Sequence, residues 1–247
     1  MNKESQTEGI VPTNEEFDVV PADTDALRHE AYRVRYQVYC VENSFLSGIN
    51  GLEFDEYDSH ARHMLLCHRH TGNIVGTVRL VTPRADGNQA DFPMQRFCSL
   101  TSIRSLPILR SGEVSRFAIS RDRLGATRST LNLLRLWLVQ GAVRMSVEAG
   151  HSHWVAILDP RLLRLLSMTA INFRKIGQPI EYHGTRQPAY VSLSTMFSEV
   201  REKRPEIWNI ITDRGRYAAV SITGDETFTT TLSNKKANNY DNNYELI

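Results

Sequence analysis

Residues 112–120 of this chain are GEVSRFAIS, and residues 76–81 are GTVRLV. Both segments are typical of strands, because apolar and β-branched residues stand on either side of each charge. Arg79, Glu113 and Arg116 are therefore expected on buried or half-buried strands. Taking an unpaired charge out of water costs several kcal/mol, so each of the three needs a partner of opposite charge or a hydrogen bond.

Two upstream segments carry charges that can supply those partners. They are Arg35 in RVRYQVY (33–39), and Glu53, Asp55 and Asp58 in GLEFDEYDSH (51–60). The acids and the arginines can satisfy one another only by meeting in space. The sequence thus predicts that these distant segments converge, either in a functional site or in a structural ion-pair network.

The composition argues against several classes of protein. With 29 Lys+Arg and 28 Asp+Glu among 247 residues, the formal net charge is +1, so no overall field favours nucleic acid or an anionic membrane. The residues after Met1 lack the apolar core of a secretory signal, and no stretch approaches roughly 18 apolar residues in a row. Cys40, Cys67 and Cys98 are expected to be reduced core residues. We therefore expect a cytoplasmic protein without a transmembrane segment.

The order of the expected elements predicts an α+β fold. Helices are expected at 25–42, 127–149, 161–177 and around 201–211, and strands at 17–22, 62–70, 71–83, 113–120, 153–160, 179–184 and 187–194. A polar connection with a short helix covers 84–111. This order favours a mixed sheet with helices on both faces. A single domain at 17–223 is expected, with a flexible tail at 1–16 and a disordered tail at 224–247.

Four segments together carry a family resemblance. They are RVRYQVYCVE (33–42), GLEFDEYDSHARHMLLCHRHTGNIVGTVRLVTP (51–83), DFPMQRF (91–97) and GEVSRFAIS (112–120). In this order they resemble the acyltransferases associated with PEP-CTERM/exosortase systems, which are similar to acyl-homoserine-lactone (autoinducer) synthases and to N-acyl amino acid synthases. The resemblance covers about residues 25–195. It implies the GCN5-related N-acetyltransferase (GNAT) fold, with a mostly antiparallel mixed sheet and helices on both faces.

The resemblance extends to individual residues. The family's Arg with an aromatic four residues later matches Arg35 and Tyr39, and its paired acids match Asp55 and Asp58. Its strand Arg after a Gly and its Glu-x-x-Arg-Phe strand match Arg79, Glu113, Arg116 and Phe117. The autoinducer synthases carry a Trp between the first two motifs, whereas NSFLSGIN (43–50) has only Phe45. This departure favours the exosortase-associated or amino-acid-acylating branch over the lactone-forming branch that uses S-adenosylmethionine.

The implied reaction moves an acyl group from a thioester to the amine of a small acceptor such as an amino acid. Glu113 is the candidate base, because an α-amino group has a pKa near 8 and must lose a proton to attack. A carboxylate near Arg116 is expected to have a lowered pKa, so orienting the amine or organising the strand are equal alternatives. The expected groups are catalytic Glu113, Arg116 and Arg79, acceptor-binding Arg35, Tyr39, Asp55 and Asp58, and oxyanion-binding backbone N–H groups around Phe117, Ala118 and Ile119.

The segment SRDRLGATR (120–128) is the candidate site for the acyl donor. It opens the long helix and supplies free N–H groups, and the expected donor-binding residues are Arg121, Arg123, Gly125, Ala126 and Arg128. It has fewer glycines than the usual acetyltransferase loop, which favours an acyl carrier protein over free acyl-coenzyme A as the thioester. No tightly bound cofactor is expected. No metal is expected either, because His68 and His70 share a strand face but lack a third ligand.

Structural and functional alternatives remain open at this point. Arg35 could be a snorkelling surface residue, Asp55 and Asp58 could be solvated or could cap a turn, and the strand charges could form a purely structural network. A lactone-forming signal synthase and a non-catalytic acyl-binding module are the alternative functions. An apolar tunnel between the Glu113 strand and 153–160 would favour long acyl chains, and a filled core there would favour acetyl transfer or no transfer.

Overall fold

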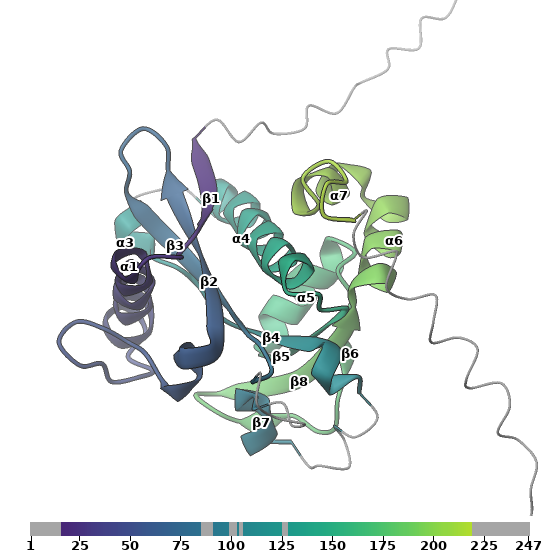
Figure 1. Ribbon diagram of the computed structural model, residues 1–247, viewed down its shortest axis with the longest axis horizontal. Coiled ribbons are helices and arrows are strands. Elements are labelled where there is room, and N and C mark those ends of the chain that lie inside the picture. The colour runs from purple at the N-terminus through teal and green to yellow at the C-terminus, as the bar shows by residue number, and fades with distance from the viewer. Residues whose placement is uncertain (1–15, 85–90, 99–102, 104–105, 125–127, 219–247) are drawn as a thin grey trace, which may run out of the picture.

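One mixed β-sheet runs through the residues that the computed structural model describes, which are 16–84, 91–98, 103, 106–124 and 128–218, the last of these by backbone only at 128–130. The strand order is β1-β2-β3-β4-β5-β8-β6, with β7 paired to β8 (Figure 1). The strands are β1 Phe17–Pro21, β2 Ala61–His68, β3 Ile74–Val81, β4 Ser111–Ile119, β5 His153–Leu158, β6 Arg174–Lys175, β7 Ile180–Glu181 and β8 Thr185–Ser192. Among these strands β4 and β5 pair in parallel, and the other pairs are antiparallel.

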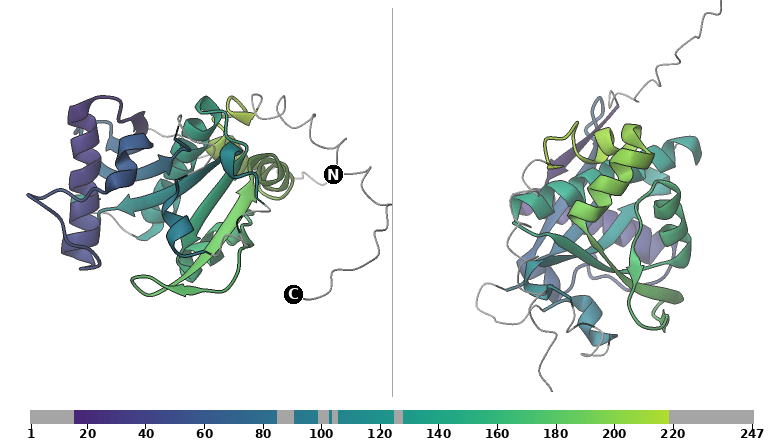
Figure 2. Two further views of the ribbon diagram at one scale, coloured as in Figure 1. Left: turned by 60° about the horizontal axis from the view of Figure 1, so that its bottom comes forward. Right: turned by 90° about the vertical axis from the view of Figure 1, so that its right-hand side faces the viewer.

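Helices cover both faces of the sheet, as Figures 1 and 2 show. On one face lies α1 (Asp25–Tyr36), and on the other lie α4 (Arg128–Glu148), α5 (Pro160–Met168), α6 (Leu193–Lys203) and α7 (Pro205–Ile211). Alternation along β2 creates the two layers, because Leu65 packs with Ala31 of α1 while Met64 and Leu66 join the core under α4. The predicted α+β layout is therefore confirmed.

The centre of the sheet opens between β4 and β5. These strands pair only over Ser111–Glu113, opposite His153–Val155, and then separate. In the same region β4 bulges against β3, since Arg79 pairs with Ser115 but Thr77 pairs with Ala118. Two residues of β4 thus oppose one residue of β3, and Arg116 at this point has a φ of 50°. A β-bulge bends a strand and redirects a side chain, and here it does so at the predicted site.

One predicted helix is shorter than expected. The helix expected at 161–177 ends at Met168, and Arg174–Lys175 form β6 instead. The end is a Schellman motif, in which the N–H of Ile171 donates to Leu166 O at 3.0 Å and the N–H of Ala170 donates to Ser167 O at 3.0 Å. Ala170 adopts the left-handed φ of 63° that this motif requires. The apolar periodicity of the sequence continues past Met168 because Ile171 is also buried, although it lies in a loop and not in a helix.

Other expected elements need smaller changes. The first helix continues beyond Tyr36 as a π-helical segment, Gln37–Glu42, and the predicted loop at 43–58 ends in a 3-10 turn, Glu56–His60. The late helical region expected around 201–211 contains α7, whereas α6 begins earlier than expected, at Leu193 after its cap Ser192. The expected tails fall outside the described residues, apart from Glu16. Among the described helices, none has the length and apolar character needed to cross a bilayer.

Candidate active site

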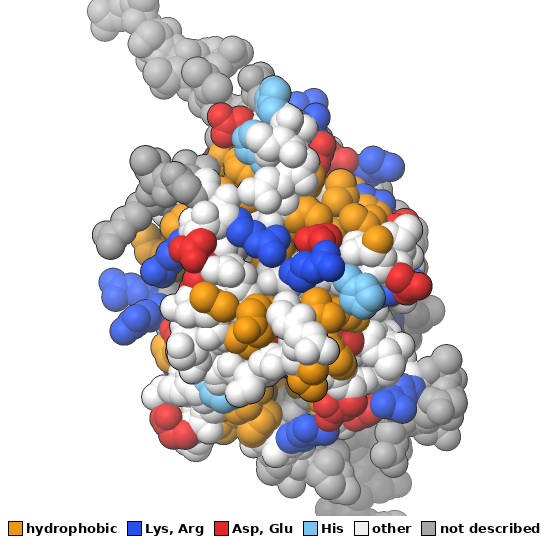
Figure 3. All heavy atoms as spheres, turned by 90° about the vertical axis from the view of Figure 1, so that its left-hand side faces the viewer, with side chains coloured by type: hydrophobic (Ala, Val, Ile, Leu, Met, Phe, Trp, Pro, Cys, Tyr) orange, Lys and Arg blue, Asp and Glu red, His pale blue; other side chains and the backbone are white. Residues whose placement is uncertain are grey.

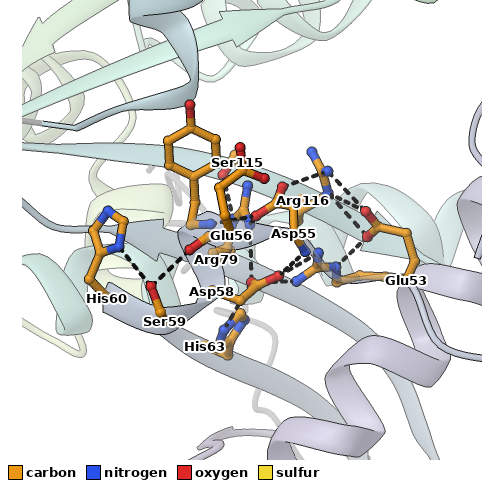
Figure 4. A network of polar contacts seen from close by, with 12 residues as sticks. Glu53, Asp55, Glu56, Asp58, Ser59, His60, His63, Arg79, Ser115 and Arg116 are labelled. Atoms are coloured by element: carbon orange, nitrogen blue, oxygen red, sulfur yellow. Dashed lines mark hydrogen bonds and ion pairs between the residues drawn. The ribbon is translucent and has the colours of Figure 1, made fainter. Parts of the chain in front are cut away.

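Arg35 anchors a buried network of charges on the sheet face that carries α1. Figure 4 shows Glu53, Asp55 and Asp58 of this network beside Arg79 and Arg116. Its side chain has no solvent exposure and leaves α1 beside buried Ala31 and Val34. Nε donates to Glu53 Oε2 at 2.5 Å, and Nη1 and Nη2 donate to the two oxygens of Asp58 at 2.7 and 3.0 Å. Arg35 is therefore not a snorkelling surface residue, since the Nε, Nη1 and Nη2 groups of its guanidinium are all paired with acids inside the fold.

The two strand arginines complete this network. Arg79 donates from Nη1 to Asp55 at 2.5 Å and to Asp58 at 3.0 Å, and from Nε to Ser115 Oγ at 3.0 Å. Arg116 donates from Nη2 to Glu53 at 2.9 Å and to Asp55 at 2.9 Å, and its Nε lies 3.1 Å from both oxygens of Glu53. The predicted convergence of these three arginines with three acids is thus what the structure shows. The bulge at Arg116 makes it possible, because regular alternation after Ser115 would send that side chain toward α4.

Asp55 and Asp58 also fix the turn that presents them. The N–H of Asp55 donates to Asp58 Oδ2 at 2.8 Å, and the N–H of Tyr57 donates to Asp55 Oδ1 at 3.0 Å, forming a capping box on the 3-10 turn. The two carboxylates therefore hold their own backbone and bind arginines at the same time. Both the turn-capping interpretation and the network interpretation of these residues hold.

The network keeps Glu53 and Asp58 ionised. Burial alone would raise the pKa of Asp58, but hydrogen bonds and charge from Arg35, with the charge of Arg79, hold it well below its usual range. The pKa of Glu53 is lowered in the same way, because Arg35 and Arg116 outweigh the effect of burial. Three guanidinium groups balance three acids, so the network is close to neutral overall. On the face of the molecule that α1 covers, the surface charges are likewise mixed in sign (Figure 3).

Glu113 stands apart from the six-residue network. Its side chain is 2% exposed, and Oε2 accepts the N–H of Met94 at 2.9 Å. Burial raises the pKa of Glu113 to about 7, although the Met94 N–H and the charges of Arg79 and Arg116 act in the opposite direction. The expectation that Arg116 would bring this pKa below its usual value is therefore wrong, because the effect of burial outweighs the charges of Arg79 and Arg116. A carboxyl that titrates near neutral pH is suited to accepting a proton.

Two cavities meet beside Glu113. One, the Glu113 cavity, has a volume of about 150 Å³ and is bordered by Glu113, Phe97 and Tyr182. The other, the strand-gap cavity, has about 280 Å³, occupies the opening between β4 and β5, and is lined by apolar groups such as Ala142 and Leu166. Both are bordered by Tyr39, Phe45, Ser115, Arg116, Ile157 and Arg186. Of the two alternatives left open for the region between the Glu113 strand and 153–160, the structure therefore shows an apolar cavity and not a filled core.

Comparison with known proteins agrees with this geometry. Residues 34–137 match the family model described as an acetyltransferase (GNAT) domain. The chain has the GNAT acyltransferase fold. It is 31% identical over 137 residues to an acyl-homoserine-lactone synthase of Agrobacterium fabrum, a match that covers 54% of this chain and 63% of that relative. The aligned part is therefore less than two thirds of the relative's length.

Solved structures support the same GNAT fold. The CoA-dependent acyl-homoserine lactone synthase BjaI, with SAM and isopentyl-CoA, superposes with a TM-score of 0.57 at 19% identity, covering 82% of this chain and 89% of that one. FeeM, an N-acyl amino acid synthase from uncultured soil microbes, superposes with a TM-score of 0.50 at 14% identity, covering 74% and 94%.

The predicted donor-binding residues of this GNAT domain fall into three groups. Arg121 borders a groove of about 290 Å³ beside Phe117, Ala118 and Ile119 of β4. Arg123 turns away from the groove, because its Nη1 donates to Ile74 O at 3.1 Å. Gly125, Ala126 and the side chain of Arg128 lie outside the described residues.

Three arginines at this GNAT site were not predicted. Arg135 and Arg161 border the same groove as Arg121, and Arg186 borders both cavities. Glu53 was expected only as one of the converging acids, and it is the acid that joins Arg35 to Arg116. His63 lies under the network with Nε2 3.4 Å from Asp58 Oδ1, and burial lowers its pKa to about 3, so it is neutral. His63 pairs with Arg79 across β2 and β3, a register that could have identified it.

The predicted acceptor-binding residues also differ in their access to the cavities. Arg35 is completely buried, as is Arg79, which was predicted as catalytic. Tyr39, in contrast, borders both cavities, with its hydroxyl 3.4 Å from Phe117 O. In the described part of the chain no cluster of three or more His, Cys, Asp or Glu side chains forms a metal site.

Proposed function

We propose that this protein is an N-acyltransferase that moves a long acyl chain from a carrier thioester to the amine of a small acceptor such as an amino acid. The observation that carries the proposal is the meeting of two unlike cavities at Ser115 and Arg116. One is apolar and the other contains a carboxyl whose pKa is about 7. An acyl chain in the first would place its thioester carbonyl next to an amine in the second.

The strand-gap cavity supports an acyl group longer than acetyl. It reaches from β4 to Ala142 of α4 and Leu166 of α5, and its walls are largely apolar. A void of this size costs packing energy when it is empty, because the side chains that line it lack partners. A hydrocarbon chain would restore those contacts and gain the free energy of leaving water.

Glu113 is the proposed base. An α-amino group has a pKa of about 8, so at neutral pH it must lose a proton before it attacks. Glu113, directly or through one water, takes that proton, and the neutral amine nitrogen then bonds to the thioester carbonyl carbon. The tetrahedral intermediate collapses, the C–S bond breaks, and the leaving thiolate takes up the second proton that the amine nitrogen gives up as the amide forms. The pKa of Glu113 places its ionised form within reach at neutral pH.

Backbone groups of β4 are the proposed oxyanion donors. The N–H of Ser120 donates to Val75 O on β3, and Ala118 pairs with Thr77 on the same side. Alternation along the strand directs the N–H groups of Phe117 and Ile119 the other way, toward the opening that β5 leaves. Donors that are fixed before the reaction stabilise developing negative charge most effectively.

The six-residue network is proposed to hold this machinery in place. Arg35, Arg79, Asp55 and Asp58 fix Ser115 and Arg116, while Arg116 and Tyr39 reach the cavities themselves. We therefore assign positioning roles to the buried arginines and acids, and contact with the substrates to Arg116 and Tyr39.

The groove bordered by Arg121, Arg135 and Arg161 is the proposed donor groove, and its charge favours an anionic carrier. Burial and the charge of Arg121 lower the pKa of Arg135, which indicates two cations close together, and Arg161 borders the same groove. A phosphopantetheine phosphate would fit between them. We propose acyl carrier protein as the donor, with acyl-coenzyme A as the alternative. The four matching segments support an enzyme of a PEP-CTERM/exosortase system. We further propose that it is cytoplasmic and formed by one domain at 17–223.

Similarity to the acyl-homoserine-lactone synthase supports a second candidate function, a lactone-forming signal synthase. It differs from the first in requiring S-adenosylmethionine. The absence of a Trp from NSFLSGIN (43–50) argues for the first candidate.

One experiment separates these functions. The purified protein is incubated with acyl chains of increasing length on coenzyme A and on carrier protein, and with amino acids or S-adenosylmethionine. Release of free thiol and new amides are measured together, the latter by mass spectrometry. Amides of amino acids support the first function, and lactones with methylthioadenosine support the second. Thioester binding without thiol release from any donor would indicate a non-catalytic module. Glu113→Gln should abolish turnover, whereas the exposed Glu56→Gln should not.

A further inference from the structure

We propose that Arg186 binds a carboxylate of the acceptor and thereby selects amino acids over amines that lack a carboxylate. This inference rests on the proposed N-acyltransferase function and assigns a specificity-determining residue to it. Arg186 is the second residue of β8, just before the stretch in which β8 pairs with β5 from Gln187 opposite Leu158. From there it borders both cavities, on the wall opposite β4.

The hydrogen-bonding capacity of Arg186 is only partly used. Its Nη1 donates to Asp159 Oδ2 at 3.2 Å and to Thr185 O at 3.0 Å. Within the described residues, its Nε and Nη2 make no hydrogen bond. Asp159 is itself shared, because its Oδ1 accepts the N–H of Arg161 at the start of α5. One edge of the Arg186 guanidinium therefore remains available for a ligand.

Arg116, the other arginine at the junction of the two cavities, is differently placed. Its Nε and Nη2 are already bound to Glu53 and Asp55. A substrate carboxylate at Arg116 would have to compete with two acidic side chains, each 2.9 Å away. Arg186 has one acid, at 3.2 Å, and its side chain is 17% exposed. The cation with the weaker internal pairing is the better carboxylate-binding group.

The positions of Arg186 and Glu113 match the chemistry of an α-amino acid. Such an acceptor carries its amine and its carboxylate on one carbon. Both side chains border the same cavity of about 150 Å³, one a carboxyl that can take a proton and the other a planar guanidinium. A guanidinium forms two parallel hydrogen bonds with a carboxylate, which orients the ligand as well as binding it. Orientation of the carboxylate would turn the amine toward Glu113.

The test compares amino acids with their α-carboxamides, as two matched pools of acceptors. Arg186→Ala should lower the preference of kcat/KM for the amino acids over the carboxamides by roughly 10- to 100-fold, mainly through the KM of the amino acids. The lower amine pKa of the carboxamides cancels when variant and wild type are compared. Arg186→Lys should recover part of the preference. Asp159→Asn, which keeps a helix-capping side chain, should strengthen it by freeing Arg186.

The matched control is Arg174→Ala, an exposed arginine of β6 that borders a separate cavity of about 660 Å³. It should leave the preference unchanged. Equal losses for both acceptor pools in Arg186→Ala would overturn the inference, since they would indicate a role toward the thioester or in folding. A wild-type enzyme without preference for amino acids would overturn it too.

A binding measurement separates this inference from the proposed function. Saturation-transfer NMR on the same two pools, without thioester, reports carboxylate binding alone. If the protein releases no thiol but binds amino acids, and Arg186→Ala abolishes that binding, the carboxylate site is supported and the acyltransferase function is contradicted. If the protein acylates amines but binds carboxamides as tightly as amino acids, the acyltransferase function is supported and the carboxylate site is contradicted.

Discussion

Glu113 and Arg116 lie three residues apart on β4 and do not pair with each other. Arg116 binds Glu53 and Asp55, while Glu113 accepts a backbone N–H from Met94. The left-handed backbone at Arg116, with a φ of 50°, separates the two environments. A strained residue of this kind costs about 1–3 kcal/mol, and the six-residue network supplies the contacts that hold it.

Glu113 should make the stability of the protein fall as pH rises. Its pKa is raised from 4.5 to about 7 in the folded state, so between these values the folded chain binds more protons than the unfolded chain. Glu113→Gln removes the free-energy cost of ionising this buried carboxyl. The variant should therefore gain stability over wild type on going from pH 5 to pH 8, by up to about 3 kcal/mol. Urea unfolding at both pH values measures it, with the exposed Glu56→Gln as control. A difference that does not change with pH would contradict the raised pKa.

The same group should set the pH dependence of catalysis. On the proposed mechanism, kcat rises with pH as Glu113 loses its proton and levels off above about 7. An acceptor amine whose pKa lies below the assayed range, such as an O-alkylhydroxylamine, removes the titration of the acceptor from the profile. A stopped assay of thiol release from pH 5 to 9 gives the curve. A profile without an inflection near neutral pH would exclude Glu113 as the base.

Arg35 should be essential for folding stability, in contrast to a neighbour on the same helix. Arg35→Leu leaves buried Glu53 and Asp58 without their closest cation, which should cost about 3–5 kcal/mol. Arg33→Leu removes an exposed arginine that pairs with Glu30, and should cost less than about 1 kcal/mol. Chemical denaturation of both variants compares them. Similar losses would mean that the network does little for stability.

Much of this site could be predicted because buried charges must find partners. Arg79 and Arg116 on apolar strands required acids, and Asp55 and Asp58 were the acids available at a turn. The environment of Glu113 could not be predicted, since nothing in GEVSRFAIS marks the bulge that turns Arg116 away. Arg186 and Phe45 enter the site through tertiary contacts between distant segments, and no local pattern identifies such contacts. The early end of α5 was missed for a related reason, because Ala170 is not a residue that favours a left-handed turn.

That helix end gives a further prediction. Ala170 holds a φ of 63°, a conformation that glycine adopts at lower cost. Ala170→Gly should therefore raise the free energy of unfolding by about 0.5–1 kcal/mol. The same change within α1, Ala31→Gly, should lower it, because Ala31 is buried and helical. If both changes destabilise, the Schellman motif at Ala170 is not the stable end of α5.

The strand-gap cavity should limit the length of the acyl chain. Ala142 of α4 is buried and borders this cavity, so Ala142→Leu should fill part of it. On the proposed function, kcat/KM for the longest accepted acyl thioesters should fall while that for short ones is retained. Ala149→Leu, at the residue that follows the end of this helix and does not border the cavity, is the control. An unchanged chain-length profile would mean that the acyl group binds elsewhere.

The parallel pairing of β4 with β5 ends at Glu113, and this makes the rest of β4 an edge strand inside the sheet. Edge strands normally expose unpaired backbone groups at the rim of a sheet, where another chain can add to them and start aggregation. Here the unpaired stretch lies between two strands, with α1 on one side and α5 on the other, so a foreign sheet has no flat approach to it. The fold can therefore keep backbone N–H and C=O groups of β4 unpaired at its centre without the risk of aggregation that an exposed outer edge strand would bring.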